Sequence, residues 1–125
     1  MTLGDCDLIA FSQTTQPGRA KAFYGEVLGL KLEDDNPFVI VFSAGRTMLR
    51  IQKVEAFSPF PFSSLGWKVP DISAFARQLI QNGVTLSRFE GLVQDEVGIW
   101  ISPSGAKVCW FRDPDGNLLS LTQFP

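Results

Sequence analysis

The residue whose type and position most clearly suggest chemistry is Arg50, a cation between Leu49 and Ile51 in an apolar, strand-like segment. A guanidinium in such a place can donate a fork of hydrogen bonds to an anionic or carbonyl group of a ligand. Two structural roles compete with recognition: an ion pair with a nearby carboxylate, and an edge position that is open to water. From the sequence alone all three roles stay open.

Acid–base chemistry has few candidates in this chain. It contains no histidine, so mechanisms that need an imidazole as base, acid or metal ligand are excluded. Asp95 and Glu96 precede a strand-like segment, 97–101, and could supply a general base without a metal. Near neutral pH that role requires a carboxylate whose pKa is raised. The alternative is an acidic loop pair that is only solvated.

The composition limits the class of protein. The chain has 125 residues, which suits one domain. It is 45% hydrophobic and 19% charged, as in soluble globular proteins, and no apolar run approaches the roughly 20 residues of a membrane helix. Its formal net charge of -2 gives no basic excess for binding a phosphate backbone. We therefore expect neither nucleic acid nor membrane among its partners.

The cysteines indicate a reducing compartment. Cys6 and Cys109 are too few for a disulfide scaffold and lack the spacing of zinc or redox sites. We expect both to be small buried hydrophobic residues. The N-terminal residues lack the basic and apolar regions of a secretory signal. These features predict a cytoplasmic protein.

Two segments have the periodicity of amphipathic helices, about 17–28 and about 71–81. Each is bounded by residues that commonly begin and end helices. These residues are Thr14 or Thr15 and Gly29 for the first helix, and Asp71 and Asn82–Gly83 for the second.

A strand precedes each predicted helix and about three strands follow it, so that the same order occurs twice. The predicted strands cover residues 7–13, 38–43 and 48–54 in the first half, and 65–69, 97–101, 108–112 and 118–123 in the second. Asp34 and Asp35 are interpreted as a turn. The sequence thus predicts one α+β domain, 1–125, with module one at about 5–55, a linker at about 56–63 and module two at about 64–125.

Two motifs resemble a known family. The helix sequence Ala22-Phe23-Tyr24, followed by Val27-Leu28-Gly29-Leu30, and the segment 111–117, Phe-Arg-Asp-Pro-Asp-Gly-Asn, are similar to motifs of the vicinal oxygen chelate superfamily. That superfamily includes glyoxalase I, extradiol dioxygenases, fosfomycin-modifying transferases and bleomycin-resistance proteins. The resemblance covers essentially the whole chain. It implies two tandem βαβββ modules that form an open mixed-sheet barrel around a cleft, and we expect a homodimer.

The resemblance also implies four positions for metal ligands, usually His or Glu. In this chain they fall on Ile9, Arg50, Ser64 and Ser120. An apolar side chain, a cation and two hydroxyls do not form a site for a divalent ion, which needs imidazole or carboxylate donors. We therefore expect no metal and no other cofactor.

Strand alternation predicts which side chains face the expected cleft, because successive side chains face opposite sides of a sheet. If Ser120 faces the cleft, strand alternation places Trp67 on the helix side of the sheet. Trp100 and Trp110 are then candidates for the walls of the cleft. The alternative is that all three tryptophans belong to the core. The predicted ligand-binding residues are Phe11, Met48, Arg50, Gln52, Ser64, Trp100, Trp110 and Ser120.

These observations favour a metal-free small-molecule-binding protein of the glyoxalase/bleomycin-resistance type. Its ligand would be a small amphipathic or aromatic molecule, neutral or anionic rather than cationic, because Arg50 and Lys68 are expected in the cleft. One alternative is a glyoxalase-related lyase or isomerase that works without metal through Asp95, Glu96 or Tyr24. Another is a metabolite-sensing regulatory subunit. No catalytic residue is assigned, and whether the chain is an enzyme stays open.

Overall fold

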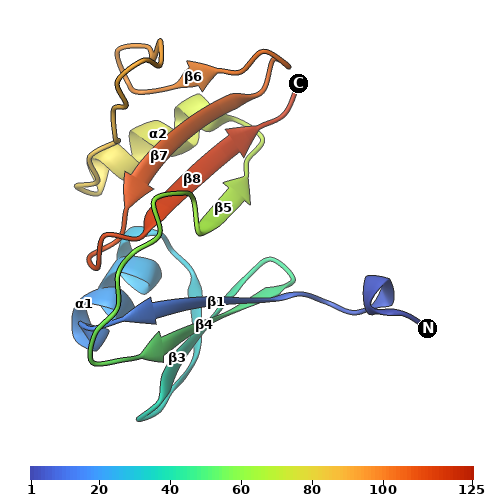
Figure 1. Ribbon diagram of the computed structural model, residues 1–125, viewed down its shortest axis with the longest axis vertical. Helices are drawn as coiled ribbons and strands as arrows, with labels where there is room; N and C mark the ends of the chain where they lie inside the picture. Colours follow the sequence, from blue (N-terminus) through green and yellow to red (C-terminus); the bar gives the residue numbers. More distant parts are fainter. The chain divides into compact units, whose positions relative to one another are not determined.

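The computed structural model describes all 125 residues, which divide into two compact units, 1–58 and 59–125 (Figure 1). The first unit contains a short 3-10 helix (Leu3–Asp5), β1 (Ile9–Thr14), α1 (Pro17–Ala22), one π-helical turn (Phe23–Val27), β2 (Lys31–Asp35), β3 (Val39–Ala44) and β4 (Thr47–Lys53). The second contains β5 (Leu65–Lys68), α2 (Ile72–Gln81), β6 (Trp100–Ile101), β7 (Lys107–Arg112) and β8 (Leu118–Gln123).

Each unit is built on one four-stranded mixed sheet. The strand orders are β1-β4-β3-β2 and β5-β8-β7-β6. In both sheets the first strand of the unit pairs in parallel with the last, and the remaining pairs are antiparallel. The repeated order confirms the predicted α+β fold with two tandem modules. The eight strands form two separate sheets that are not closed into a barrel.

In the first unit one sheet face is buried beneath the helical segment. Ser12, Leu49 and Ile51 are buried, whereas Phe11 and Met48 are about half exposed, as strand alternation requires. Tyr24, which is fully buried, contacts the ring of Phe42 at a centroid distance of 6.1 Å. Tyr24 of the helix motif therefore serves to fill the core.

The first helix differs in detail from its prediction. Its α-helical part ends at Ala22, and the predicted remainder is a π-helical turn. The residue at its N-cap is Gln16, not Thr14 or Thr15. Thr14 still contributes, because its buried hydroxyl accepts a hydrogen bond from the backbone N–H of Gln16 at 3.0 Å.

Helix α2 follows its prediction closely. The Asp71 side chain accepts a hydrogen bond from the N–H of Ala74, and Gly83 follows the helix with a φ of 91°. The side-chain oxygen of Gln123, on β8, accepts from the N–H of Ile72 at 2.9 Å. This bond fixes the start of α2 to the sheet, and Ile72, Ala76 and Leu79 are buried.

Two local predictions were wrong. Asp34 and Asp35 belong to β2, and the turn lies beyond them, where Asn36 accepts hydrogen bonds from the N–H groups of Phe38 and Val39. Ion pairs from Lys21 and Lys53 hold Asp35 in the strand. Of the strand predicted at 97–101, only Trp100 and Ile101 are in a strand, β6, because residues 95–99 form a loop.

None of the helices has the length and apolar character needed to cross a membrane.

Candidate functional site

In the first unit, the four predicted ligand-binding residues share one sheet face. Phe11 on β1 and Arg50 on β4 are register partners, and Arg50 is also paired with Val41 on β3. Met48 and Gln52 lie two residues to either side of Arg50 and therefore face the same way. The result is a cation between apolar side chains, on a face where Phe11 is 52% exposed and Met48 40%.

Arg50 has no carboxylate partner. The three ion pairs of the chain are made by Lys21, Lys31 and Lys53. The only polar side-chain contact of the Arg50 guanidinium is a weak one, from Nη1 to the sulfur of Met48 at 3.8 Å. The ion-pair alternative is therefore wrong, and the half-buried guanidinium keeps most of its donors available.

In the second unit, the other four predicted residues also gather on one side of the sheet. Ser120 is register partner to both Gly66 and Trp110. The Trp110 ring lies 6.0 Å from that of Trp100, centroid to centroid, with the planes tilted by 35°. Ser64, just before β5, donates its hydroxyl hydrogen bond to the carbonyl of Leu118 at 3.2 Å.

The tryptophans divide between the two faces of this sheet. Trp67 stacks on Phe111 at 6.4 Å, on the face that carries buried residues of the core. Trp110 faces the other way and also meets Phe89 edge-on at 5.3 Å. Neither Trp100 nor Trp110 is fully buried. Trp67 therefore lies on the helix side, as strand alternation predicts. The alternative that all three tryptophans belong to the core is not supported.

The positions expected for metal ligands hold side chains that do not fit a divalent ion. Ile9 and Arg50 lie in the first unit, and Ser64 and Ser120 in the second. None offers an imidazole or a carboxylate. No group of three or more Cys, Asp or Glu side chains comes together elsewhere in the chain.

Asp95 organises a loop and is poorly suited to act as a base. Its Oδ1 accepts hydrogen bonds from the N–H groups of Val97, Gly98 and Ile99 at 2.9, 2.8 and 2.8 Å. Burial disfavours its charge, but these three donors and the nearby Arg88 outweigh that effect and hold the pKa of Asp95 below its ordinary value. A general base near neutral pH would need the opposite shift.

The 111–117 motif has a structural role. Oδ1 of the buried Asp113 accepts from the N–H groups of Asp115 and Asn117, and its Oδ2 accepts from the Asn117 side chain at 2.9 Å. These bonds fix the tight turn between β7 and β8, as the turn-forming sequence predicts.

The cysteines differ from one another. Cys109 is fully buried on β7, and burial raises the pKa of its thiol to about 11. Cys6 is exposed, so the prediction that both are buried was wrong for Cys6. It lies outside the sheet, at the end of the short 3-10 helix.

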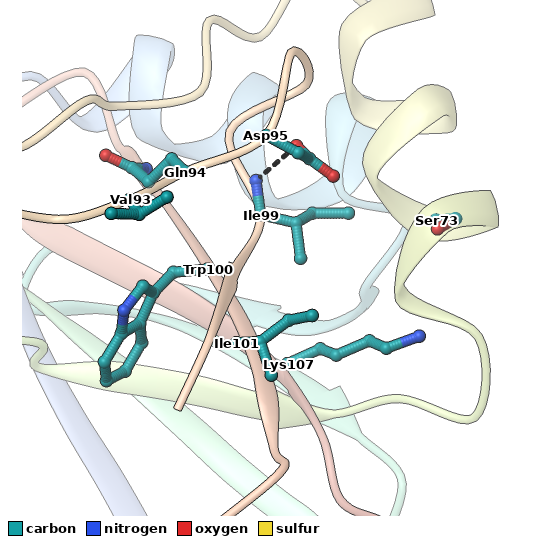
Figure 2. A pocket seen from close by; sticks show the side chains of 8 residues that line it. All are labelled: Ser73, Val93, Gln94, Asp95, Ile99, Trp100, Ile101 and Lys107. Carbon is teal, nitrogen blue, oxygen red and sulfur yellow. Dashed lines mark hydrogen bonds between the residues drawn. The ribbon is translucent and has the colours of Figure 1, made fainter. Parts of the chain in front are cut away.

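A hollow of about 580 Å³ lies beside β6, on the second unit (Figure 2). Its apolar lining is Val93, Ile99, Trp100 and Ile101, and its polar lining is Ser73, Gln94, Asp95 and Lys107. Trp100 is the only predicted ligand-binding residue among them. The sequence offered no signal for this hollow, because the exposure of its apolar residues Val93 (89%) and Ile101 (62%) is evident only in the structure.

Comparison with known proteins identifies the fold. The chain resembles, at 18% identity and a TM-score of 0.74, a lactoylglutathione lyase from Agrobacterium tumefaciens, with 95% of this chain and 93% of that one covered. It also resembles an antibiotic-binding protein from Streptomyces sp. CB03234, at 22% identity, a TM-score of 0.73 and 95% coverage of both chains. A third similar structure, from Sphaerobacter thermophilus DSM 20745, shows 20% identity, a TM-score of 0.72 and coverage of 94% and 95%.

Sequence comparison is consistent with these structures. No curated protein sequence matches the chain significantly. The family model described as Glyoxalase/Bleomycin resistance protein/Dioxygenase superfamily matches residues 10–121, which include all of both sheets except the first residue of β1 and the last two of β8. This chain therefore belongs to the glyoxalase/bleomycin resistance protein/dioxygenase superfamily.

Proposed function

We propose that this protein binds a small amphipathic or aromatic molecule, without a metal, and that Arg50 holds an anionic or carbonyl group of that ligand. The observation that carries the proposal is the half-buried guanidinium with no carboxylate partner, flanked by Phe11 and Val41 in the same register. A guanidinium without a carboxylate partner keeps its hydrogen-bond donors available to a ligand. An anionic ligand would supply the missing partner.

The second unit carries an aromatic surface of its own. Trp100 and Trp110 lie in contact on one side of the sheet, beside Ser120. Flat aromatic ligands pack well against such side chains. Binding sites for small molecules are commonly apolar with a few polar groups that fix orientation, and the predicted residues of each unit, taken by themselves, have that composition.

Metal independence is part of the proposal and is supported by the chemistry of Ile9, Arg50, Ser64 and Ser120, which lack suitable donors. A fold neighbour from Streptomyces is described as an antibiotic-binding protein. At 22% identity that likeness shows only the fold, so it makes a binding role reasonable without naming the ligand.

A matched pair of fluorescent probes tests the role of Arg50. Anilinonaphthalenesulfonate is aromatic and anionic, and N-phenylnaphthylamine has the same ring system without the sulfonate. We expect the native protein to bind the anionic probe more tightly, and Arg50→Met to weaken that binding about tenfold, because it removes charge-assisted hydrogen bonds. Binding of the neutral probe should change little.

Arg77→Met is the control, since Arg77 is exposed on α2 and lies outside the strands that carry the predicted residues. Equal affinity of native protein and Arg50→Met for the anionic probe would remove Arg50 from the site.

Elemental analysis of the purified protein tests the proposed metal independence. A near-stoichiometric metal that survives dialysis would contradict it.

We also propose a homodimer in the cytoplasm. The basis is the family resemblance for the dimer and the cysteine content for the compartment. Light scattering coupled to size-exclusion chromatography should give twice the mass of the 13.8 kDa chain. Fractionation of the source cells should place the protein with cytoplasmic markers. A monomer, or a secreted protein, would refute the respective part.

A further inference from the structure

The hollow beside β6 lies on the second unit and extends toward α2, and Trp100 is the one predicted ligand-binding residue that also lines it. Ile101 and Lys107 are register partners, and Lys107 is in turn paired with Gln123. The Gln123 side chain reaches the N–H of Ile72, at the start of α2. This row of side chains therefore points toward the first turn of α2, which supplies Ser73 to the same hollow.

Two opposite charges line the hollow without neutralising each other. Lys107 is half-buried and takes part in none of the ion pairs of the chain. Asp95 accepts three backbone hydrogen bonds, all at Oδ1, which leaves Oδ2 without a hydrogen-bond partner. Figure 2 shows the Asp95 carboxylate and the Lys107 ammonium on the same side of the hollow as Ser73.

The groups near Lys107 suit a carboxylate. Ser73 is in the first turn of α2, where the N–H groups of Ile72 and Ala74 already bond to the side chains of Gln123 and Asp71. Its hydroxyl can donate a hydrogen bond to a carboxylate. The ammonium of Lys107 adds a full positive charge.

Between the two charged ends the hollow is aliphatic. Ile99 and Ile101 lie between Asp95 and Lys107 in Figure 2. Ile101 is 62% exposed, an unusual position for a large aliphatic side chain on a strand. A volume of about 580 Å³ accommodates a small molecule and falls within the usual range for ligand sites.

We propose that this hollow is a second binding site, for an apolar dipeptide, a zwitterion whose ammonium and carboxylate are separated along the chain. The ligand carboxylate binds Lys107 and Ser73, its ammonium binds the free oxygen of Asp95, and its side chain packs on Ile99 and Ile101. Each charge of the ligand thereby meets an opposite charge, and the apolar part covers exposed isoleucine.

Heteronuclear NMR titrations of the full chain test this site residue by residue. The probe is L-leucyl-L-leucine, with its N-acetyl derivative (no ammonium), its C-terminal amide (no carboxylate) and L-leucine (both charges on one carbon) as matched controls. We expect saturable shifts at Ser73, Ile99, Ile101 and Lys107 with the dipeptide, and affinities at least about tenfold weaker for the three controls.

Variants separate the two charged ends. Lys107→Met keeps the apolar stem and should weaken zwitterion binding about tenfold, and Asp95→Asn keeps an acceptor for the loop and should do the same. Arg77→Met, on an exposed position of α2 outside the hollow, is the control and should leave the affinity unchanged.

Three results would overturn the proposal. They are no saturable shift with the dipeptide at millimolar concentration, shifts confined to the predicted face around Arg50 or Trp110, and equal binding of the dipeptide and its N-acetyl derivative. Because the readout is local to the hollow, its failure is distinguishable from a failure of the ligand site on the predicted face.

Discussion

Gly66 and Ser120 lie opposite each other on the parallel strands β5 and β8, so close that a Cβ on Gly66 would come within 2.8 Å of the Ser120 hydroxyl oxygen. A side chain at position 66 therefore requires the hydroxyl to move. Because Ser120 is a predicted ligand-binding residue, this contact also determines how much of its hydroxyl a ligand can reach.

We predict that Gly66→Ala lowers the free energy of unfolding by about 1–2 kcal/mol, through overpacking against Ser120. Chemical denaturation followed by tryptophan fluorescence measures the change. Ser120→Ala removes the hydroxyl oxygen. In that background Gly66→Ala should therefore lower the free energy of unfolding much less than it does in the native protein. If the two effects simply add, the close contact is not the cause.

The Asp113 turn offers a second prediction. Asp113→Ala removes the acceptor for three donors, two of them backbone N–H groups, in a buried turn. We expect a loss of about 2–3 kcal/mol in unfolding free energy, the cost of leaving buried donors unsatisfied. Asp113→Asn keeps one acceptor oxygen and should lose less. Equal losses for the two variants would show that the backbone hydrogen bonds contribute little.

Asp95 links the stability of its loop to pH. Since its folded pKa lies below the ordinary value of 3.8, it stabilises the folded state fully above that value, and the stabilisation is lost as the pH falls through the lower, folded pKa. We expect Asp95→Asn to flatten the stability–pH curve below about pH 4. Denaturation midpoints between acid and neutral pH measure it. An unchanged slope in the variant would assign the acid sensitivity to other carboxylates.

The two thiols should react differently. Cys6 is exposed, whereas Cys109 is buried with its pKa raised to about 11 from 9.0. A colorimetric thiol reagent should modify one cysteine in the folded protein and both in denaturant. Cys6→Ser should abolish the reaction of the folded protein. Rapid modification of Cys109 in that variant would indicate frequent opening of the sheet.

The same shift has a consequence for stability at high pH. Because the folded protein holds the Cys109 proton more tightly than the unfolded chain, this thiol's contribution is fully present below pH 9.0 and is lost as the pH rises toward about 11. Cys109→Ala should therefore weaken the dependence of stability on pH in that window, which denaturation at several alkaline pH values can measure.

Elements with strong local signals were predictable from the sequence. Asp71 and Asn82–Gly83 mark the ends of α2, and β8 spans the predicted 118–123, because capping residues and an alternating apolar segment determine these structures locally. The 97–101 segment was misjudged. Its residues are β-prone, but the N–H groups of Val97, Gly98 and Ile99 bond to the Asp95 side chain instead of to a neighbouring strand.

The faces of the sheets were also predictable, since alternation assigns Phe11 and Arg50 to one side as soon as one residue is placed. Whether Arg50 had a carboxylate partner was not predictable, because ion pairs depend on residues distant in sequence. The same holds for the hollow beside β6. Ser73 and Lys107 meet there because Gln123, the register neighbour of Lys107, ties the start of α2 to the sheet. The sequence by itself determined the two-module fold and the residues on each face; the tertiary structure decided which charges remain unpaired, because only packing brings distant side chains within reach of one another.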